Sequence, residues 1–327
     1  MLFRSWSTWR RPLRFAVLTP LATAALLTIT AQVWLGLDLP TALLLGAVLA
    51  PTDLALTADV RLPANADEAD TRTRLTTESV VGIALAVPLV LLALGLRGTH
   101  EVGRFGLGWA ALDLVWPIAA GLLLGWWAGV LVWRVVTRTT SHRDAEVPDE
   151  LVAVGTIALA CGLAMLIAAS TLCAVFAAGL ALSRAANRRN EGRADRPSIR
   201  FQSFAARLER FAMVAALLLL GALLPLHAVR PSTILFALLL LLVVRPLAAH
   251  IGLASSALAL EQRRALTWFG MRGAASLYLL ALAVNAGIGA ALTRQLTGIV
   301  VVTLVVCVAI QDLTAAPPVG GRIGQRA

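Results

Sequence analysis

The sequence predicts an all-α polytopic membrane protein with about ten transmembrane helices. Of its 327 residues, 59% are hydrophobic and only 14% are charged, whereas roughly 25% of a soluble domain is charged. Apolar stretches long enough to cross a hydrocarbon core of about 30 Å recur from end to end. All 28 basic residues are arginine, and all but a few, among them Arg245 and Arg272, lie in the gaps between these stretches. A nucleic-acid-binding protein would instead carry such charge on a soluble face, so no nucleic-acid partner is expected.

The apolar stretches define the candidate spans in order along the chain. They are 14–35, 40–59, 76–96, 109–133, 150–168, 171–186, 208–226, 232–253, 266–285 and 295–313. We group them into a first core trio (1–98), scaffold or dimerisation helices with an Arg-rich loop (99–230), a second core trio (231–316) and a cytoplasmic tail (317–327).

The arginines also predict the orientation of the chain. With both termini in the cytoplasm, 22 arginines fall on the cytoplasmic side and 4 on the other, as the positive-inside rule requires. We therefore expect a multi-pass protein of the plasma or inner membrane. The loop 184–210 carries much of this charge; it is either an ordinary cytoplasmic loop or a binding surface for anionic lipid headgroups.

Three glycines in the fourth span lie four residues apart: Gly121, Gly125 and Gly129. Such a strip of small residues lets another helix approach closely. It predicts either helix packing within the chain or a dimer interface.

The second span contains a helix breaker followed by polar residues, Pro51, Thr52 and Asp53. Proline removes a backbone donor and frees an earlier carbonyl, and a carboxylate near mid-membrane costs about 2.5–3.5 kcal/mol. Freed carbonyls, a hydroxyl and one carboxylate are what a cation site requires. The alternative is a loop in which Asp53 caps a short helix.

The ninth span has its own interruption, where Gly270 and Gly273 flank Arg272. Each interrupted span is the middle one of a trio. Paired breaks in corresponding positions are typical of a secondary transporter with inverted repeats, whose site lies where the two discontinuous helices cross. An arginine in hydrocarbon also needs a counter-charge. We predict a structural ion pair with Glu78, because a carboxylate satisfies the guanidinium fork; Asp53 is the other possible partner.

No feature predicts an enzyme, a cofactor or a bound metal. Cys161, Cys173 and Cys307 lie within apolar stretches without metal-ligand spacing. The four histidines do not cluster.

Several segments resemble the monovalent cation:proton antiporter family that includes the sodium/hydrogen exchangers. They are "GAVLAPTDLALTADV" (46–60), "TLCAVFAAGLALSR" (171–184) and "WFGMRGAASLYLLALAV" (268–284). The resemblance implies a six-helix core that slides against a dimerisation domain. Thr52 and Asp53 then fall on a discontinuous core helix, Glu78 on the acid of the "ExxxND" motif and Arg272 on its partner.

The chain departs from that family at the "ExxxND" motif. Gly82 and Ile83 stand where the family has Asn and the principal ion-binding Asp. The family's final helix also commonly ends in His and Gly, where this chain has Gln311 and Asp312. About three helices that precede the first span in the family are not found in the sequence.

We therefore hypothesise a homodimeric secondary transporter that exchanges a monovalent cation for protons by alternating access. Na⁺ is the expected cation, with Li⁺ or K⁺ as alternatives, and Asp53 and Thr52 are the expected ion and proton ligands. The alternative hypothesis is a degenerate or truncated homologue that acts as a scaffold or regulatory subunit.

Overall fold

The computed structural model describes residues 6–53, 68–100, 108–140, 149–189, 230–254, 258–268, 270 and 272–315, with five isolated positions between 211 and 222. Every element in these ranges is a helix. Four sequence predictions fall wholly or largely outside them: the second span beyond Asp53, most of the loop 184–210, the span 208–226 and the tail 317–327.

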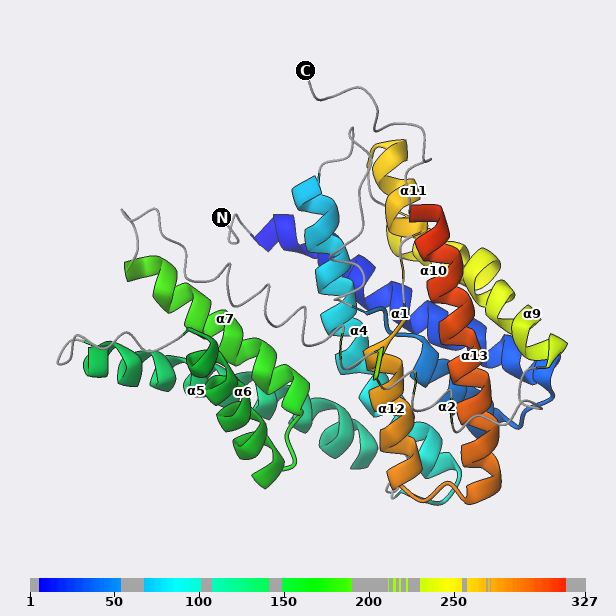
Figure 1. The fold of residues 1–327 in the computed structure, drawn as a ribbon, viewed down its shortest axis with the longest axis horizontal. Helices are drawn as coiled ribbons and strands as arrows, with labels where there is room; N and C mark the ends of the chain where they lie inside the picture. Colours follow the sequence, from blue (N-terminus) through cyan, green and yellow to red (C-terminus); the bar gives the residue numbers. More distant parts are fainter. Residues whose placement is uncertain are drawn as a thin grey trace. The chain divides into compact units, whose positions relative to one another are not determined.

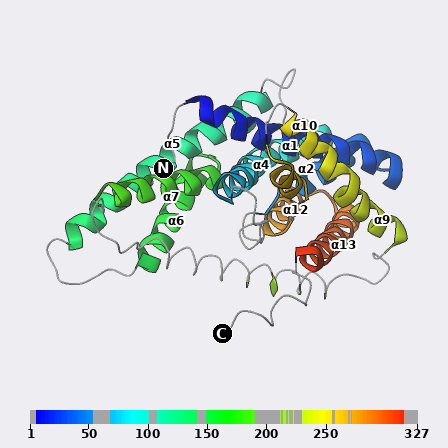
Figure 2. The same ribbon diagram turned by 90° about the horizontal axis from the view of Figure 1, so that it is seen from above.

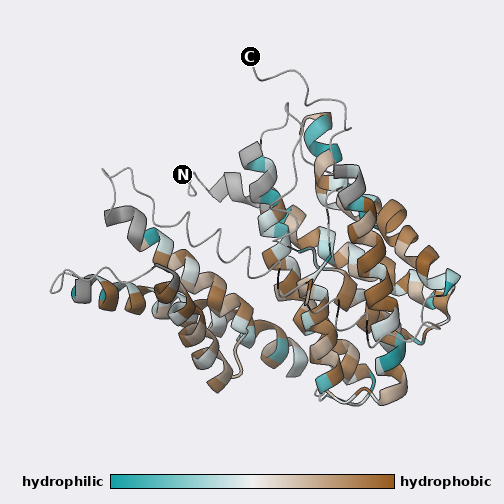
Figure 3. Cartoon of the chain, in the orientation of Figure 1, coloured by the Kyte–Doolittle hydropathy of each residue, from teal (hydrophilic) through white to brown (hydrophobic). Residues whose placement is uncertain are grey.

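The described chain forms two compact units, one from residues 1–100 and 213–327 and the other from residues 101–212. Among the described residues, five helices are long and apolar enough to cross a membrane: 13–35, 74–96, 109–138, 231–253 and 290–311. Shorter apolar helices span 39–49, 151–166, 171–185 and 274–285. The prediction of an all-helical polytopic membrane protein is confirmed. Apolar residues cover the greater part of most helices, and hydrophilic residues gather toward helix ends (Figure 3).

The first unit contains two groups of helices, and each group includes a short apolar helix, α2 in the first and α12 in the second (Figure 1). The first group is α1 (Trp6–Leu35), α2 (Leu39–Leu49) and α4 (Glu68–Leu96). The second begins with α9 (Pro231–Leu239), a π-helical segment η4 (Leu240–Val244) and α10 (Arg245–Leu253), which run on from one another. It continues with α11 (Leu260–Trp268), α12 (Ala274–Asn285) and α13 (Ala290–Ala315).

The two short helices are half-spans. Helix α2 has 11 residues and α12 has 12, which at 1.5 Å per residue gives about 17 Å, roughly half of a hydrocarbon core. Within the predicted span 40–59, helix α2 ends at Leu49, and the chain from Pro51 to Asp53 is not helical. Pro51 explains the end, since it has no N–H to continue the helix.

A large apolar core of buried side chains joins α1, α2 and α4 to α9, α12 and α13. Figure 2 shows these helices gathered together. Leu45 and Val48 of α2, Leu94 of α4 and Leu279 of α12 are among the buried side chains of this core. Because α2 packs on α1, α4 and α12, its end is enclosed by protein. A helix break at membrane depth is tolerated in such a place.

The second unit consists of η2 (Trp109–Val115), α5 (Trp116–Thr140), α6 (Asp149–Leu166) and α7 (Thr171–Arg189), with α5 packed most extensively on α7. The glycine strip makes this contact. A Cβ at Gly121 would lie 2.6 Å from the carbonyl oxygen of Ser170, and one at Gly125 or Gly129 would collide with the backbone of α7. The three glycines therefore serve helix packing within the chain.

This close approach predicts opposite effects for one substitution at two glycines of the second unit. Gly125→Ala should lower the melting temperature in detergent, since the added methyl meets the carbonyl of Ala174 and overpacking costs about 1–3 kcal/mol. Gly155→Ala on α6 meets nothing within 4 Å, so it should leave the melting temperature unchanged or raise it. Equal shifts for the two variants would contradict the packing.

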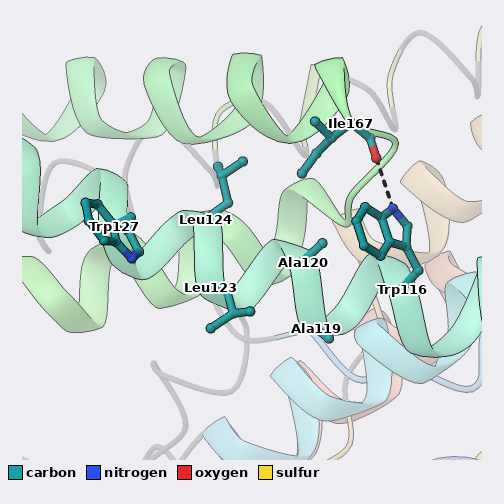
Figure 4. Close-up of a pocket in the computed structure, with 7 residues that line it drawn as sticks. All are labelled: Trp116, Ala119, Ala120, Leu123, Leu124, Trp127 and Ile167. Carbon is teal, nitrogen blue, oxygen red and sulfur yellow. Dashed lines mark hydrogen bonds between the residues drawn. The ribbon is translucent and has the colours of Figure 1, made fainter.

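A groove on the surface of α5 is lined only by apolar residues (Figure 4). They are Trp116, Ala119, Ala120, Leu123, Leu124, Trp127 and Ile167. The indole Nε1 of Trp116 donates to the carbonyl oxygen of Ile167 at 3.1 Å, which ties α5 to the end of α6. The predicted homodimer stays a prediction, since nothing in the structure shows what covers this groove.

Candidate functional site

The two interrupted segments meet where α2 ends and α12 begins. The carboxylate of Asp53, 2% exposed, accepts a hydrogen bond from the backbone N–H of Ala274 at 2.6 Å. In return, Nε of the fully buried Arg272 donates to the carbonyl oxygen of Leu49 at 2.8 Å. A negative group thus lies at the positive N-terminus of α12, and a positive group at the negative C-terminus of α2. Asp53, which follows the end of α2, thus stabilises the start of α12. Arg272, which precedes α12, stabilises the end of α2.

The predicted ion pair between Glu78 and Arg272 is wrong. Arg272 donates instead to two backbone carbonyls, Leu49 at 2.8 Å and Gly270 at 2.7 Å. The physical reason is local: both helix breaks leave carbonyls without intrahelical partners, and a guanidinium at the crossing reaches one from each break.

Glu78 forms its bidentate ion pair with Arg245, the first residue of α10. Nη1 of Arg245 bonds Oε1 of Glu78, and Nη2 bonds Oε2 at 3.0 Å. Nη2 also donates to the carbonyl oxygen of Leu266 in α11 at 3.1 Å. Both charged side chains are 1% exposed, so this pair joins α4, α10 and α11 inside the core.

Gly270 is required because of this arginine. A Cβ at position 270 would collide with the guanidinium of Arg245. Gly273 lies at the other side of Arg272 and is the residue from which α12 begins. The two glycines bracket the break, as the sequence predicts. Position 270 needs a glycine because the side chain of Arg245 closely approaches the backbone there.

Thr52 lies at the start of a chain of hydroxyl groups. Its Oγ1 is 3.0 Å from Oγ of Ser79, and Ser79 donates its own proton to the carbonyl oxygen of Leu75 at 3.0 Å. Since a hydroxyl has one proton, Thr52 must be the donor toward Ser79. Its remaining lone pairs can then serve a cation. Ser79, fully buried, is a polar residue of the site that the sequence reasoning missed; its position directly after Glu78 was the available signal.

The position of the family's Asn and Asp is apolar here. Gly82 is buried, and a Cβ on it would lie 3.2 Å from Cγ of Pro20 and 3.7 Å from Cα of Pro51. Ile83 adds an aliphatic side chain. The acids assigned to the crossing are therefore Asp53 and Glu78, and the second is held by Arg245.

A family model described as sodium/hydrogen exchanger, transmembrane, matches residues 3–320. The chain belongs to the sodium/hydrogen exchanger family. The chain is a multi-pass membrane protein, and its family is one of transporters whose substrates are monovalent cations and protons.

The solved structures that resemble this chain include two of the sodium proton antiporter MjNhaP1 from Methanocaldococcus jannaschii. The structure at pH 8 has a TM-score of 0.70 at 20% identity, and the electron-microscopy structure has a TM-score of 0.72 at 19% identity. Each match covers 94% of this chain and 76% of the other. At such identities the likeness establishes the fold alone. A comparison with curated proteins finds no match.

Proposed function

We propose that the exchanger moves one monovalent cation against one proton, with Asp53 as the group that binds each in turn. The observation that carries the proposal is the buried carboxylate of Asp53 at the N-terminus of α12, beside the hydroxyl of Thr52. A carboxylate so enclosed binds a proton or a metal cation but not both at once. Competition for one group is sufficient to couple the two movements.

The charges at the crossing support a one-for-one exchange. Asp53 and Glu78 carry one negative charge each, and Arg245 and Arg272 carry one positive charge each. These four groups balance when Asp53 is ionised. A proton or a monovalent cation on Asp53 changes the total by the same single charge, so either occupied state presents the same net charge to the surrounding low-dielectric protein.

Thr52 supplies the neutral oxygen ligand of this site. Its proton is directed to Ser79, which leaves its lone pairs for the cation. The carbonyl oxygen of Leu49 accepts from the guanidinium of Arg272, whose positive charge opposes a cation at the same oxygen. We therefore expect the neutral oxygen ligands of the first break to come from residues after Leu49. Sodium is the cation we expect, by family membership, and alternating exposure of the crossing to the two sides is the mechanism we propose.

Purified protein in liposomes tests this function. With an imposed pH gradient, adding Na⁺, Li⁺ or K⁺ outside should collapse the gradient at a rate that saturates with cation concentration. For a one-for-one exchange, clamping the membrane potential at different values with a potassium ionophore should leave the Na⁺-driven rate unchanged. Absence of any cation-dependent proton movement would favour a homologue without transport activity, and a rate that follows the potential would contradict the stoichiometry.

A further inference from the structure

The end of α11 is held by three buried side chains at alternate carbonyls. The carbonyl oxygen of Leu266 accepts from Arg245, that of Trp268 from Gln311 and that of Gly270 from Arg272. A helix C-terminus leaves carbonyls without intrahelical partners, which side chains must then satisfy if the end is buried. Two of the three donors carry charge, and Gln311 is the neutral one.

Gln311 belongs to α13 and is fully buried. Its Nε2 donates to the carbonyl oxygen of Trp268, the last residue of α11, at 2.9 Å. The orientation of the amide is determined by this contact, because the flipped amide would place two oxygens against each other.

A second contact from α13 holds the side chain of the same residue. Nε1 of Trp268 donates to Oγ1 of Thr314 at 3.1 Å. Gln311 and Thr314 are three residues apart and so lie on one face of α13. Helix α13 therefore forms hydrogen bonds with both the backbone and the indole of Trp268, four residues before Arg272.

We infer that Gln311 is a positioning residue for exchange, an inference that rests on the proposed function. By fixing where α11 ends, Gln311 fixes the short segment that carries Arg272 to Leu49 and the amide of Ala274 to Asp53. In this role Gln311 contacts neither the cation nor the proton. It affects exchange by holding the interrupted segment between α11 and α12 in place.

The neutrality of Gln311 matters as much as its N–H. A carboxylate at this position would offer no donor to Trp268 and would add a third acid to a region with two arginines. An arginine or lysine would add a third positive charge, which would oppose cation binding at Asp53. An amide satisfies the carbonyl and leaves the charge balance of the crossing intact.

The test compares Gln311→Leu, which removes the donor, with Gln311→His, whose ring Nε2–H reaches about as far as the amide nitrogen. Gln295→Leu, at an exposed position of the same helix, is the matched control. Deuterium uptake of peptides covering residues 265–277 reports the break without requiring transport. Liposome assays then give the maximal rate and the apparent KM for Na⁺.

Gln311→Leu should raise deuterium uptake in 265–277 and raise the apparent KM about tenfold, as expected for a buried carbonyl left without its donor, while the maximal rate changes less. Gln311→His should restore both values, and Gln295→Leu should match the wild type. Wild-type uptake and KM in Gln311→Leu would overturn the inference, as would a defect that Gln311→His fails to reverse.

If the wild type exchanges no cation, the proposed function fails, and deuterium uptake alone decides whether Gln311 holds the break. If Gln311→Leu does not fold, Trp268→Phe and Thr314→Val probe the second hydrogen bond between α13 and Trp268. These two variants and the double variant should raise deuterium uptake in 265–277 equally, because each removes the same hydrogen bond. Unchanged uptake in all three would contradict the claim that α13 holds the end of α11.

Discussion

Replacing Asp53 with asparagine is expected to abolish cation-driven proton movement. The amide keeps a carbonyl oxygen that can accept the N–H of Ala274, so the two breaks should stay together. It removes the negative charge and the group that takes the proton. Leaving a desolvated charge without its partner costs about 3–5 kcal/mol, which corresponds to roughly a hundredfold or more in cation binding.

The measurement is the initial rate of gradient collapse in liposomes, with Asp38→Asn as the control. Asp38 precedes α2 and lies beside Arg97 at 3.6 Å, with a side chain that is 62% exposed. It shares the residue type of Asp53 but not its burial, and Asp38→Asn should keep most of the activity. Wild-type exchange in Asp53→Asn would remove Asp53 from the mechanism, and a melting temperature far below the wild type would assign its effect to folding.

Hydropathy and helix-breaking residues predicted most of the structural elements that position this site. Apolar length located the long spans, since a bilayer fixes that length. The break in the second span was located by Pro51, and the break in the ninth by Gly270 and Gly273. Proline and paired glycines are both common causes of an interrupted helix. Arg272 and Asp53 were expected at the crossing because a charge inside the membrane is costly and usually marks a functional site. Both residues are buried there.

Partners across the crossing could not be predicted in the same way. Hydropathy gives the depth of a residue in the membrane but not which neighbouring helix it faces. Arg245 and Arg272 both lie within apolar spans, and either has the fork that suits Glu78. The choice depends on how α10 and α12 are rotated, and on the carbonyls that the breaks release.

The same limit explains the polar residues that went unassigned. Ser79 and Gln311 are ordinary residues of apolar spans until Thr52 and Trp268 are brought against them. Sequence distances of 27 and 43 residues separate these partners. Helix α11 begins six residues before the predicted span 266–285, at Leu260, because its first turns are polar and carry no apolar signal.

The ion pair between Glu78 and Arg245 gives the second large effect. Arg245→Met should lower the free energy of unfolding by about 3–5 kcal/mol, since Glu78 would remain charged without a partner inside the core. It would also leave the carbonyl of Leu266 without its donor. Glu78→Gln should cost a similar amount by isolating Arg245. Asp38→Asn is the control: its side chain is 62% exposed beside Arg97, and exposed ion pairs contribute about 0–1 kcal/mol.

A double-mutant cycle in detergent, followed by thermal or denaturant unfolding, decides which arginine is coupled to Glu78. Combining Glu78→Gln with Arg245→Met removes both charges, so the double variant should be much more stable than the sum of the single losses predicts. Combining Glu78→Gln with Arg272→Met should be closer to additive, because Arg272 donates to the carbonyls of Leu49 and Gly270 and not to Glu78. The larger coupling in the Arg272 cycle would restore the pairing predicted from sequence and contradict the geometry of this crossing.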